Sequence, residues 1–175
     1  LGLAFLLVAP AAAGDVVAAG WDHFYNLEYR EAIGAFEKAI AAAPEAPENH
    51  NYLAQAILYQ ELHRLGALES ELLTGHNHFL RDEKIRPDPA AEARFHSVVA
   101  RAIELAQARL KTNPRDAPAL YALGSSYALR TNYEFLVQKA WRKAVSDGSL
   151  ARKHHNRVVE LDPGHYDAML SQGAY

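Results

Sequence analysis

The spacing of apolar residues between Gly20 and Pro44 predicts two short helices separated by a tight corner. The first helix carries Trp21, Phe24 and Tyr25. The second has apolar side chains at the i, i+3, i+4, i+7 spacing of one helix face, at Tyr29, Ala32, Ile33, Phe36, Ala39 and Ile40. Leu27 and Glu28 leave room only for a turn, and Pro44 ends the second helix because proline lacks an amide donor. The stretch is predicted to be a helical hairpin.

Two kinds of landmark in this hairpin return further along the chain. Small residues recur at Gly20, Ala54, Gly124 and Gly173, and prolines recur at Pro44, Pro114 and Pro163. The steps between the small residues are 34, 70 and 49 residues, and the steps between the prolines are 70 and 49. Because the two series agree, we infer a repeat of about 34 residues. Units two and three then carry insertions of 36 and 15 residues.

These landmarks resemble the tetratricopeptide repeat (TPR) family from about Val16 to Tyr175. Its second helix has an alanine, matched by Ala32, Ala102 and Ala151, followed by an aromatic residue, matched by Phe36 but replaced by Ala106 and His155. The resemblance implies an all-α, right-handed solenoid of helical hairpins, with helices elongated by the insertions in units two and three. It also implies a module that binds other proteins.

The insertion in unit two is predicted to be mostly helical. A helix begins at Pro47 and continues past Leu62 through Leu72 to Gly75, and residues 75–86 form an exposed loop. Asp88 is a candidate N-cap with Pro89 at the first helical position, which predicts a long helix to about Lys111.

In unit three, Asp116 and Pro118 open a helix, and a second apolar stripe follows it. The stripe contains Tyr133, Val137, Ala140, Trp141, Ala144, Ala151, His155, Val158 and Val159. Its phase is kept across Gly148, so either one helix kinked at Asp147 and Gly148 or two helices meeting there would fit. Tyr175 falls inside the first helix of a fourth unit, so we expect the array to continue.

Residues 1–13 have the character of a truncated signal peptide, and residues 14–175 form the repeat domain. An apolar run from Leu3 to Val8 precedes Ala11 and Ala13, which have the A-x-A spacing of a signal-peptidase site. We expect cleavage after Ala13 and a periplasmic or secreted protein; a buried first helix is the alternative. The run is too short to span a membrane.

Composition narrows the possible functions. Of the 175 residues, 50% are hydrophobic and the net charge is −3, which favours a folded helical protein over a nucleic-acid binder. The absence of cysteine excludes disulfides and thiolate catalysis. No cofactor is implied, and the oligomeric state is left open.

The nine histidines are the main candidates for catalysis or metal binding. Neither His76 with His78 nor His154 with His155 has the spacing of H-E-x-x-H, and phosphate-loop and G-x-S-x-G motifs are lacking. His155 and His23 are predicted to be core histidines. The helical domain of an enzyme or metal-binding protein remains an alternative function.

A basic face is predicted in unit three. It consists of Lys139, Arg142, Lys143, Lys153 and Arg157. This face could dock an acidic partner or a lipid surface. A solvated helix face with internal ion pairs is the simpler interpretation.

The TPR resemblance implies a concave groove lined by the first helix of each unit. Carried over by position, the lining is Trp21, Phe24 and Tyr25, then Asn51, Gln55, Leu58 and Tyr59, then Tyr121, Ser125 and Leu129. Aromatic rings supply buried area and amides can bond a peptide backbone, although the same rings could simply fill space between helices. The family's Lys and Asn clamp for a peptide carboxylate is absent, since Val17 and Trp21 occupy its first two positions. The sequence therefore favours a non-enzymatic interaction or scaffolding module of the cell envelope.

Overall fold

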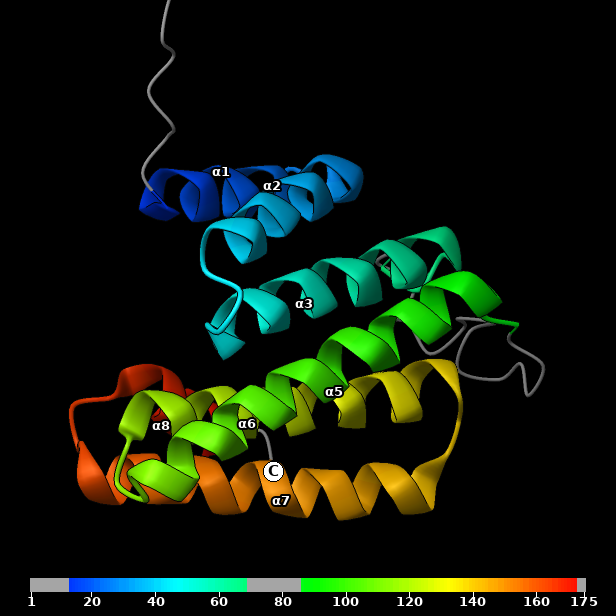
Figure 1. The fold of residues 1–175 in the computed structure, drawn as a ribbon. Coiled ribbons are helices and arrows are strands. Elements are labelled where there is room, and N and C mark those ends of the chain that lie inside the picture. Colours follow the sequence, from blue (N-terminus) through cyan, green and yellow to red (C-terminus); the bar gives the residue numbers. More distant parts are fainter. Residues whose placement is uncertain (1–12, 69–85, 173–175) are drawn as a thin grey trace, which may run out of the picture.

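The computed structural model describes residues 13–68 and 86–172, and these residues form helices and turns without a β-strand. In chain order the elements are α1 (Ala13–Tyr25), α2 (Tyr29–Ala42), α3 (Pro47–Arg64), α5 (Pro89–Thr112), α6 (Ala117–Asn132), the π-helix η2 (Tyr133–Val137), α7 (Trp141–Leu161) and α8 (Tyr166–Gln172). The pairs α1–α2, α3–α5 and α6–α7 pack as hairpins and stack in order, α2 on α3 and α5 on α6 (Figure 1). The predicted all-α stack of helical hairpins is confirmed.

Several sequence predictions fall outside the described residues. These are the signal peptide over residues 1–12, the loop histidines His76 and His78, and the fourth small landmark, Gly173. Within the described part of the chain, no helix is both long enough and apolar enough to cross a bilayer.

Two of the small landmark residues, Gly20 and Gly124, are explained by rings that lie against them. A Cβ added at Gly20 would lie 2.5 Å from the Phe36 ring, and one added at Gly124 would lie 2.5 Å from the His155 ring. Each ring is buried, and each comes from the second helix of the same hairpin. The two helices can therefore approach closely only where the first helix has no side chain. At the corner between α1 and α2, Leu27 adopts the left-handed φ of 63° that a tight turn needs.

The first helix of unit two is shorter than predicted. It ends at Arg64, not at Gly75, although leucines continue to appear at helical spacing beyond it. Gly66 adopts a φ of 69°, and the amide of Ala67 donates to the carbonyl of Leu62, which reverses the chain in the manner of a helix C-cap. Ala67 is itself buried, so the chain turns back onto the core.

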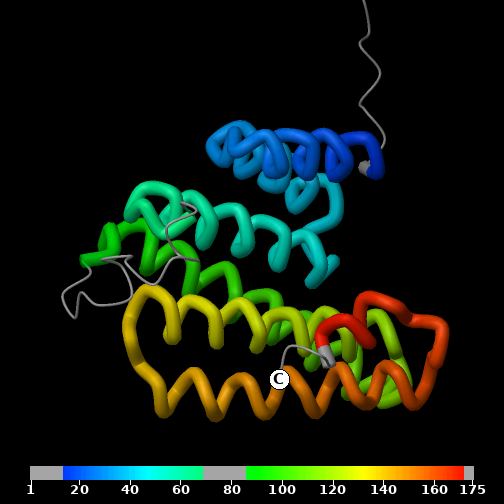
Figure 2. The backbone as a smooth tube through the Cα atoms, turned by 180° about the vertical axis from the view of Figure 1, so that it is seen from behind, coloured from blue at the N-terminus to red at the C-terminus, as the bar shows by residue number. Residues whose placement is uncertain are grey.

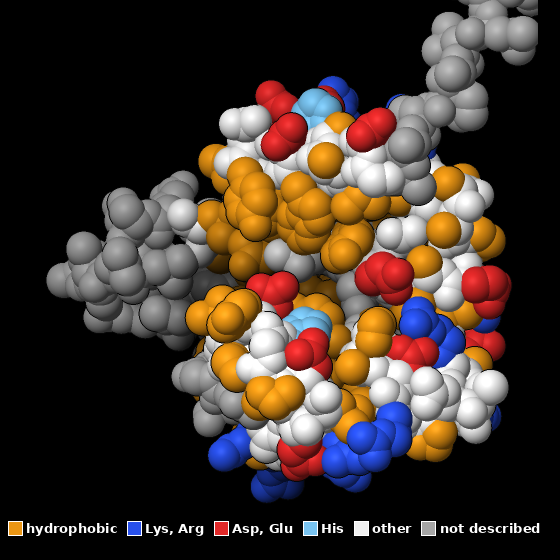
Figure 3. Space-filling model, turned by 90° about the vertical axis from the view of Figure 1, so that its left-hand side faces the viewer, with side chains coloured by type: hydrophobic (Ala, Val, Ile, Leu, Met, Phe, Trp, Pro, Cys, Tyr) orange, Lys and Arg blue, Asp and Glu red, His pale blue; other side chains and the backbone are white. Residues whose placement is uncertain are grey.

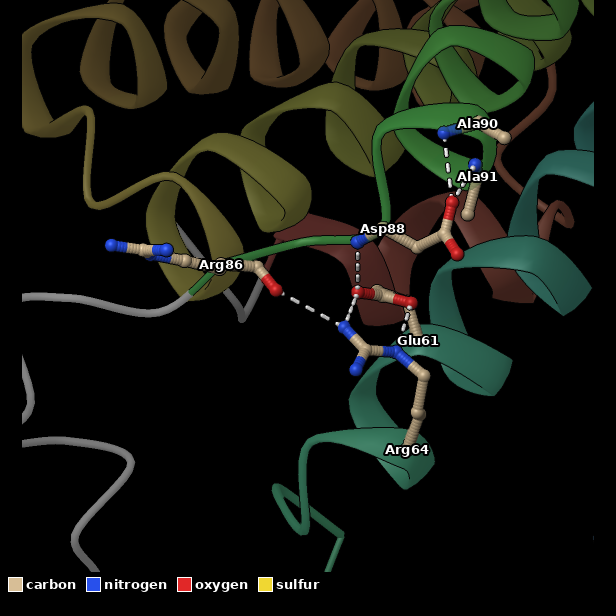
Figure 4. A network of polar contacts seen from close by, with 6 residues as sticks. All are labelled: Glu61, Arg64, Arg86, Asp88, Ala90 and Ala91. Carbon is tan, nitrogen blue, oxygen red and sulfur yellow. Dashed lines mark hydrogen bonds and ion pairs between the residues drawn. The ribbon is translucent and has the colours of Figure 1, made fainter.

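A polar clamp joins the two ends of the unit-two insertion (Figure 4). Glu61, only 3% exposed, accepts hydrogen bonds from Arg64 Nε at 2.9 Å and from the Asp88 amide at 2.9 Å. Arg64 also donates to the carbonyl of Arg86. Asp88 then caps α5 by accepting from the amides of Ala90 and Ala91, which confirms the predicted start of that helix.

We expect Glu61→Ala to lower the free energy of unfolding by about 1–3 kcal/mol, because the Asp88 amide and the Arg64 guanidinium lose their shared acceptor. Urea denaturation followed by circular dichroism measures the change. Glu45→Ala is the matched control, since Glu45 also pairs with an arginine, Arg101, but is 76% exposed. Equal losses in the two variants would show that the clamp contributes no more than an exposed ion pair.

The chain breaks in unit three at a different residue from the one predicted. Helix α7 runs without interruption through Gly148, so two helices do not meet there. The break lies at Lys139, which has a φ of 54°, directly after η2. The Ala140 amide donates to the carbonyl of Glu134 across this wide turn. Trp141, predicted on the apolar stripe, consequently starts a new helix and is 59% exposed.

Candidate functional site

A groove of about 670 Å³ follows the first helices of the successive units. Figure 2 shows α1, α3, α6 and α8 following one another along this side of the molecule. The groove is lined by Trp21, Tyr25, Glu48, Asn51, Tyr52, Gln55, Tyr59, Pro118, Tyr121, Ala122, Ser125, Ala128, Leu129, Asn132, His155, His165, Asp167 and Ser171. The face drawn in Figure 3 is hollowed, with a dense hydrophobic area above the hollow and acidic side chains at its rim.

Most of the residues predicted to line a groove do line it. They are Trp21, Tyr25, Asn51, Gln55, Tyr59, Tyr121, Ser125 and Leu129. The prediction is wrong for Phe24 and Leu58, which are 6% and 1% exposed and belong to the main hydrophobic core. Phe24 turns inward because its ring packs edge-on against Tyr29 and Tyr59, so it fills space between helices.

Asn51 does not have the role expected of it. Its amide nitrogen donates to the carbonyl of Ala122 at 2.8 Å, and its amide oxygen accepts from the Ser126 hydroxyl at 2.7 Å. Both groups are thus occupied in joining α3 to α6, and the residue is only 5% exposed. Gln55, one turn further along α3, is half-buried at the groove and remains the better amide for a bound backbone.

The aromatic side chains of the groove differ in how firmly they are packed. Trp21 lies edge-on to both Phe36 and Tyr52, with ring centroids 5.2 Å apart in each case, so its body belongs to the core. Tyr121 lies 4.6 Å from the His165 ring and is half-buried. Tyr25, in contrast, is 77% exposed at the end of α1. The groove therefore combines a rigid aromatic floor with an accessible ring at one end.

The groove is acidic among its described residues. Glu48 and Asp167 line it, whereas none of the described lining residues is lysine or arginine. Burial raises the pKa of Tyr52, and the nearby carboxylates of Glu48 and Asp167 raise it further. Burial and then Asp167 likewise raise the pKa of Tyr121. Both carboxylates thus act on Tyr52, and Asp167 also acts on Tyr121.

Neither carboxylate was predicted from the sequence, although both occupy the same position in the repeat. Glu48, Pro118 and Asp167 each lie six residues before a small landmark, and all three line the groove. Tyr52 was not among the predicted lining residues, because its neighbour Asn51 occupies the groove position carried over from the repeat family. It turns toward the groove through its edge-on contact with Trp21.

The described histidines are not gathered with carboxylates into a metal site. His155 is 1% exposed, as predicted, and burial lowers its pKa to about 4. The prediction of a core position is wrong for His23, whose Nδ1 lies 2.6 Å from Glu28 Oε2 and whose side chain is 41% exposed. Across residues 13–68 and 86–172 no three histidine or carboxylate side chains are grouped so that they could hold a metal ion.

The predicted basic face is only partly a continuous surface. Arg142, Lys143 and Lys153 are exposed on α7, and Arg157 pairs with Glu160 at 2.6 Å. Lys139 is half-buried in the turn before α7, and burial lowers its pKa. The structure therefore separates Lys139 from the helical part of the face.

The fold and groove define a helical-repeat protein with a concave, tyrosine-lined surface. Comparison with solved structures finds the first TPR domain of Spaghetti (RPAP3) bound to the HSP90 peptide SRMEEVD, with 18% identity over 97% of this chain and 94% of that one and a TM-score of 0.43. It also finds TTC0263, a thermophilic TPR protein of Thermus thermophilus, with 17% identity over 93% and 98% of the two chains and a TM-score of 0.26. No protein-family model and no curated protein matches the chain.

Proposed function

We propose that this chain is a non-enzymatic protein-interaction module of the cell envelope, whose groove holds an extended segment of another protein that carries lysine or arginine. The observation that supports this occupant is the charge and chemistry of the groove. Tyrosine rings and the carboxylates of Glu48 and Asp167 line it, without a basic side chain among the described lining residues.

A lysine or arginine side chain matches both features of this lining. Its aliphatic stem can lie on a tyrosine ring while its charge is attracted by the ring face, an interaction of about 0.5–1 kcal/mol at an exposed site. The head group can then pair with Glu48 or Asp167, which lie at the groove. Gln55 offers a donor and an acceptor to the backbone of the bound segment.

Tyr25→Ala is expected to weaken binding of such a segment about tenfold, the effect of losing ~1.4 kcal/mol at an aromatic contact. The probe is a fluorescent ten-residue peptide that alternates lysine with alanine, and fluorescence anisotropy gives Kd. Tyr166→Ala is the matched control, because Tyr166 is 76% exposed against 77% for Tyr25 but does not line the groove. If both variants bind like the parent chain, the groove is not the binding surface.

Removing the two groove carboxylates tests the charge of the occupant separately. We expect Glu48→Gln combined with Asp167→Asn to weaken binding of the lysine peptide about fivefold, since exposed ion pairs each contribute under about 1 kcal/mol. Glu45→Gln combined with Glu160→Gln changes the net charge equally at exposed carboxylates outside the groove and should leave Kd unchanged. A glutamate–alanine peptide that binds as tightly as the lysine peptide would contradict the proposed occupant.

The envelope location rests on the A-x-A pattern at Ala11 and Ala13. Expression of the full reading frame followed by N-terminal sequencing tests it. A mature protein that begins at Gly14 in the extracytoplasmic fraction is the expected result, and an uncleaved cytoplasmic protein would contradict it.

A further inference from the structure

A second, polar pocket of about 500 Å³ lies beside η2, away from the groove. Side chains from α5, α6, η2, the turn after it and α7 meet there. Those that bear on its chemistry are His96, Arg130, Glu134, Gln138, Lys143 and Asp147. None of these six residues lines the groove, so the pocket is separate from the site described above. π-helical turns such as η2 occur frequently at functional sites.

The central residue of this pocket is Glu134, which is only 5% exposed. Its Oε2 atom is buried and has no hydrogen-bonding partner among the described residues. The wide turn of η2 fixes the residue here, since the Glu134 carbonyl accepts from the Ala140 amide. A buried carboxylate oxygen without a donor is costly, which makes a ligand that supplies one a reasonable explanation.

Arg130 and Gln138, the lining residues nearest to Glu134 in the sequence, donate hydrogen bonds to other acceptors. Arg130 NH2 donates to Asp147 Oδ1 at 2.6 Å, and Arg130 Nε donates to Asp147 Oδ2. The Gln138 amide donates to Glu92 Oε1 at 2.5 Å and lies 3.3 Å from His96 Nε2. Lys143 is the remaining cation of the pocket, and its exposed, flexible side chain acts electrostatically on Glu134.

The charges of the pocket favour a cationic ligand. Among the lining residues, Glu134 and Asp147 balance Arg130 and Lys143 when all four are ionised. Glu92, which accepts a hydrogen bond from the lining residue Gln138, adds one negative charge beside the pocket. Burial lowers the pKa of His96, so the imidazole adds no positive charge at neutral pH. Burial is the main cause that raises the pKa of Glu134, and the charge of Asp147 and a hydrogen bond with its side chain raise it further, against the charges of Arg130 and Lys143. A bound cation would stabilise the ionised form of Glu134.

We propose that this pocket binds a small primary ammonium compound, whose N–H groups donate to Glu134 Oε2. A divalent metal ion is a poorer fit, because both Asp147 oxygens accept from Arg130 and the described residues contain no cluster of three metal ligands. An anion would be repelled by Glu134. The ligand is recognised by its hydrogen-bond donors as well as by its charge.

Titration of the ¹⁵N-labelled chain with methylammonium chloride tests this proposal by NMR. We expect saturable shifts of amides in residues 133–140, with Kd in the millimolar range. Tetramethylammonium chloride has the same charge without an N–H group and should bind at least tenfold more weakly. Equal shifts with tetramethylammonium, sodium or magnesium chloride would overturn the proposal, because they would report charge screening or a metal ion.

Two substitutions are expected to change the affinity for methylammonium in opposite directions. Glu134→Gln should weaken the binding of methylammonium at least tenfold. Lys143→Met should strengthen this binding several-fold, because it removes the ammonium group that competes for Glu134. Lys153→Met, also exposed on α7 but outside the pocket, is the control and should not change Kd. Since Lys143 is exposed, its variant is expected to fold even if Glu134→Gln does not. Unchanged or weaker binding in Lys143→Met would overturn the proposal.

Discussion

Phe36→Ala is expected to lower the free energy of unfolding by about 3–5 kcal/mol, the usual cost of removing a fully buried phenylalanine. Phe36 is 0% exposed, and its ring packs edge-on to Trp21 with centroids 5.2 Å apart. It also fills the space above Gly20, where a Cβ would lie 2.5 Å from the ring. Urea denaturation measures the loss. Phe135→Ala provides the comparison. Because Phe135 is 39% exposed, its substitution should lower the free energy of unfolding far less.

A double variant tests whether the ring-on-glycine contact causes this sensitivity. Gly20→Ala alone should destabilise by about 1–3 kcal/mol, because the ring has to move away from the new methyl group. In the Phe36→Ala background the same methyl group enters the space left by the ring, so its cost should fall or change sign. Additive losses would show that Gly20 is small for another reason.

The same contact explains why the repeat could be predicted from the sequence. Gly20 with Phe36 and Gly124 with His155 are the same arrangement in two hairpins, each with a ring lying on a residue that lacks a side chain. Because a stack of hairpins repeats this close approach, the small residues recur in the sequence and locate the helices. The position of the groove follows, since it lies along the first helix of each unit.

The ends of the helices could not be predicted in the same way. Leu65 and Leu68 continue the apolar spacing of α3, yet the helix ends at Arg64 through a left-handed Gly66 and the clamp on Glu61. The partner in that clamp is the amide of Asp88, far along the chain, so local periodicity contains no sign of it. The break at Lys139 uses a left-handed φ at a lysine, a residue that does not signal a turn, whereas Gly148 does and lies inside a regular helix.

The assignment of groove residues failed for a related reason. Position in the repeat identifies the side of the helix but not the depth of the side chain, and Phe24 and Leu58 extend into the core. Asn51 is at the predicted place, but Ser126 and the Ala122 carbonyl occupy its amide. These partners come from α6, so the occupancy of the amide depends on packing between units.

His155→Phe is expected to remove much of the sensitivity of this fold to acid. Burial is the main cause that lowers the pKa of His155 from its usual 6.5 to about 4; the neighbouring His154 and His165 lower it further, and a hydrogen bond with the Tyr121 backbone opposes them. Between these two pH values the unfolded chain binds a proton at this residue that the folded chain does not, so stability must fall as the pH is lowered. The expected loss from this one group is about 2 kcal/mol at pH 5 and ~3 kcal/mol at pH 4.

Phenylalanine is the appropriate replacement because Phe36 occupies the equivalent place above Gly20. The measurement is the difference in unfolding free energy between the parent chain and His155→Phe, obtained by urea denaturation at several pH values from 7 to 4. Carboxylates common to both chains cancel in this difference, so it should grow steadily in favour of the variant as the pH falls below about 6.5. His154→Phe changes the adjacent, half-buried residue and should give a smaller trend. A difference that does not vary with pH would mean that His155 takes up its proton in the folded chain as readily as in the unfolded one.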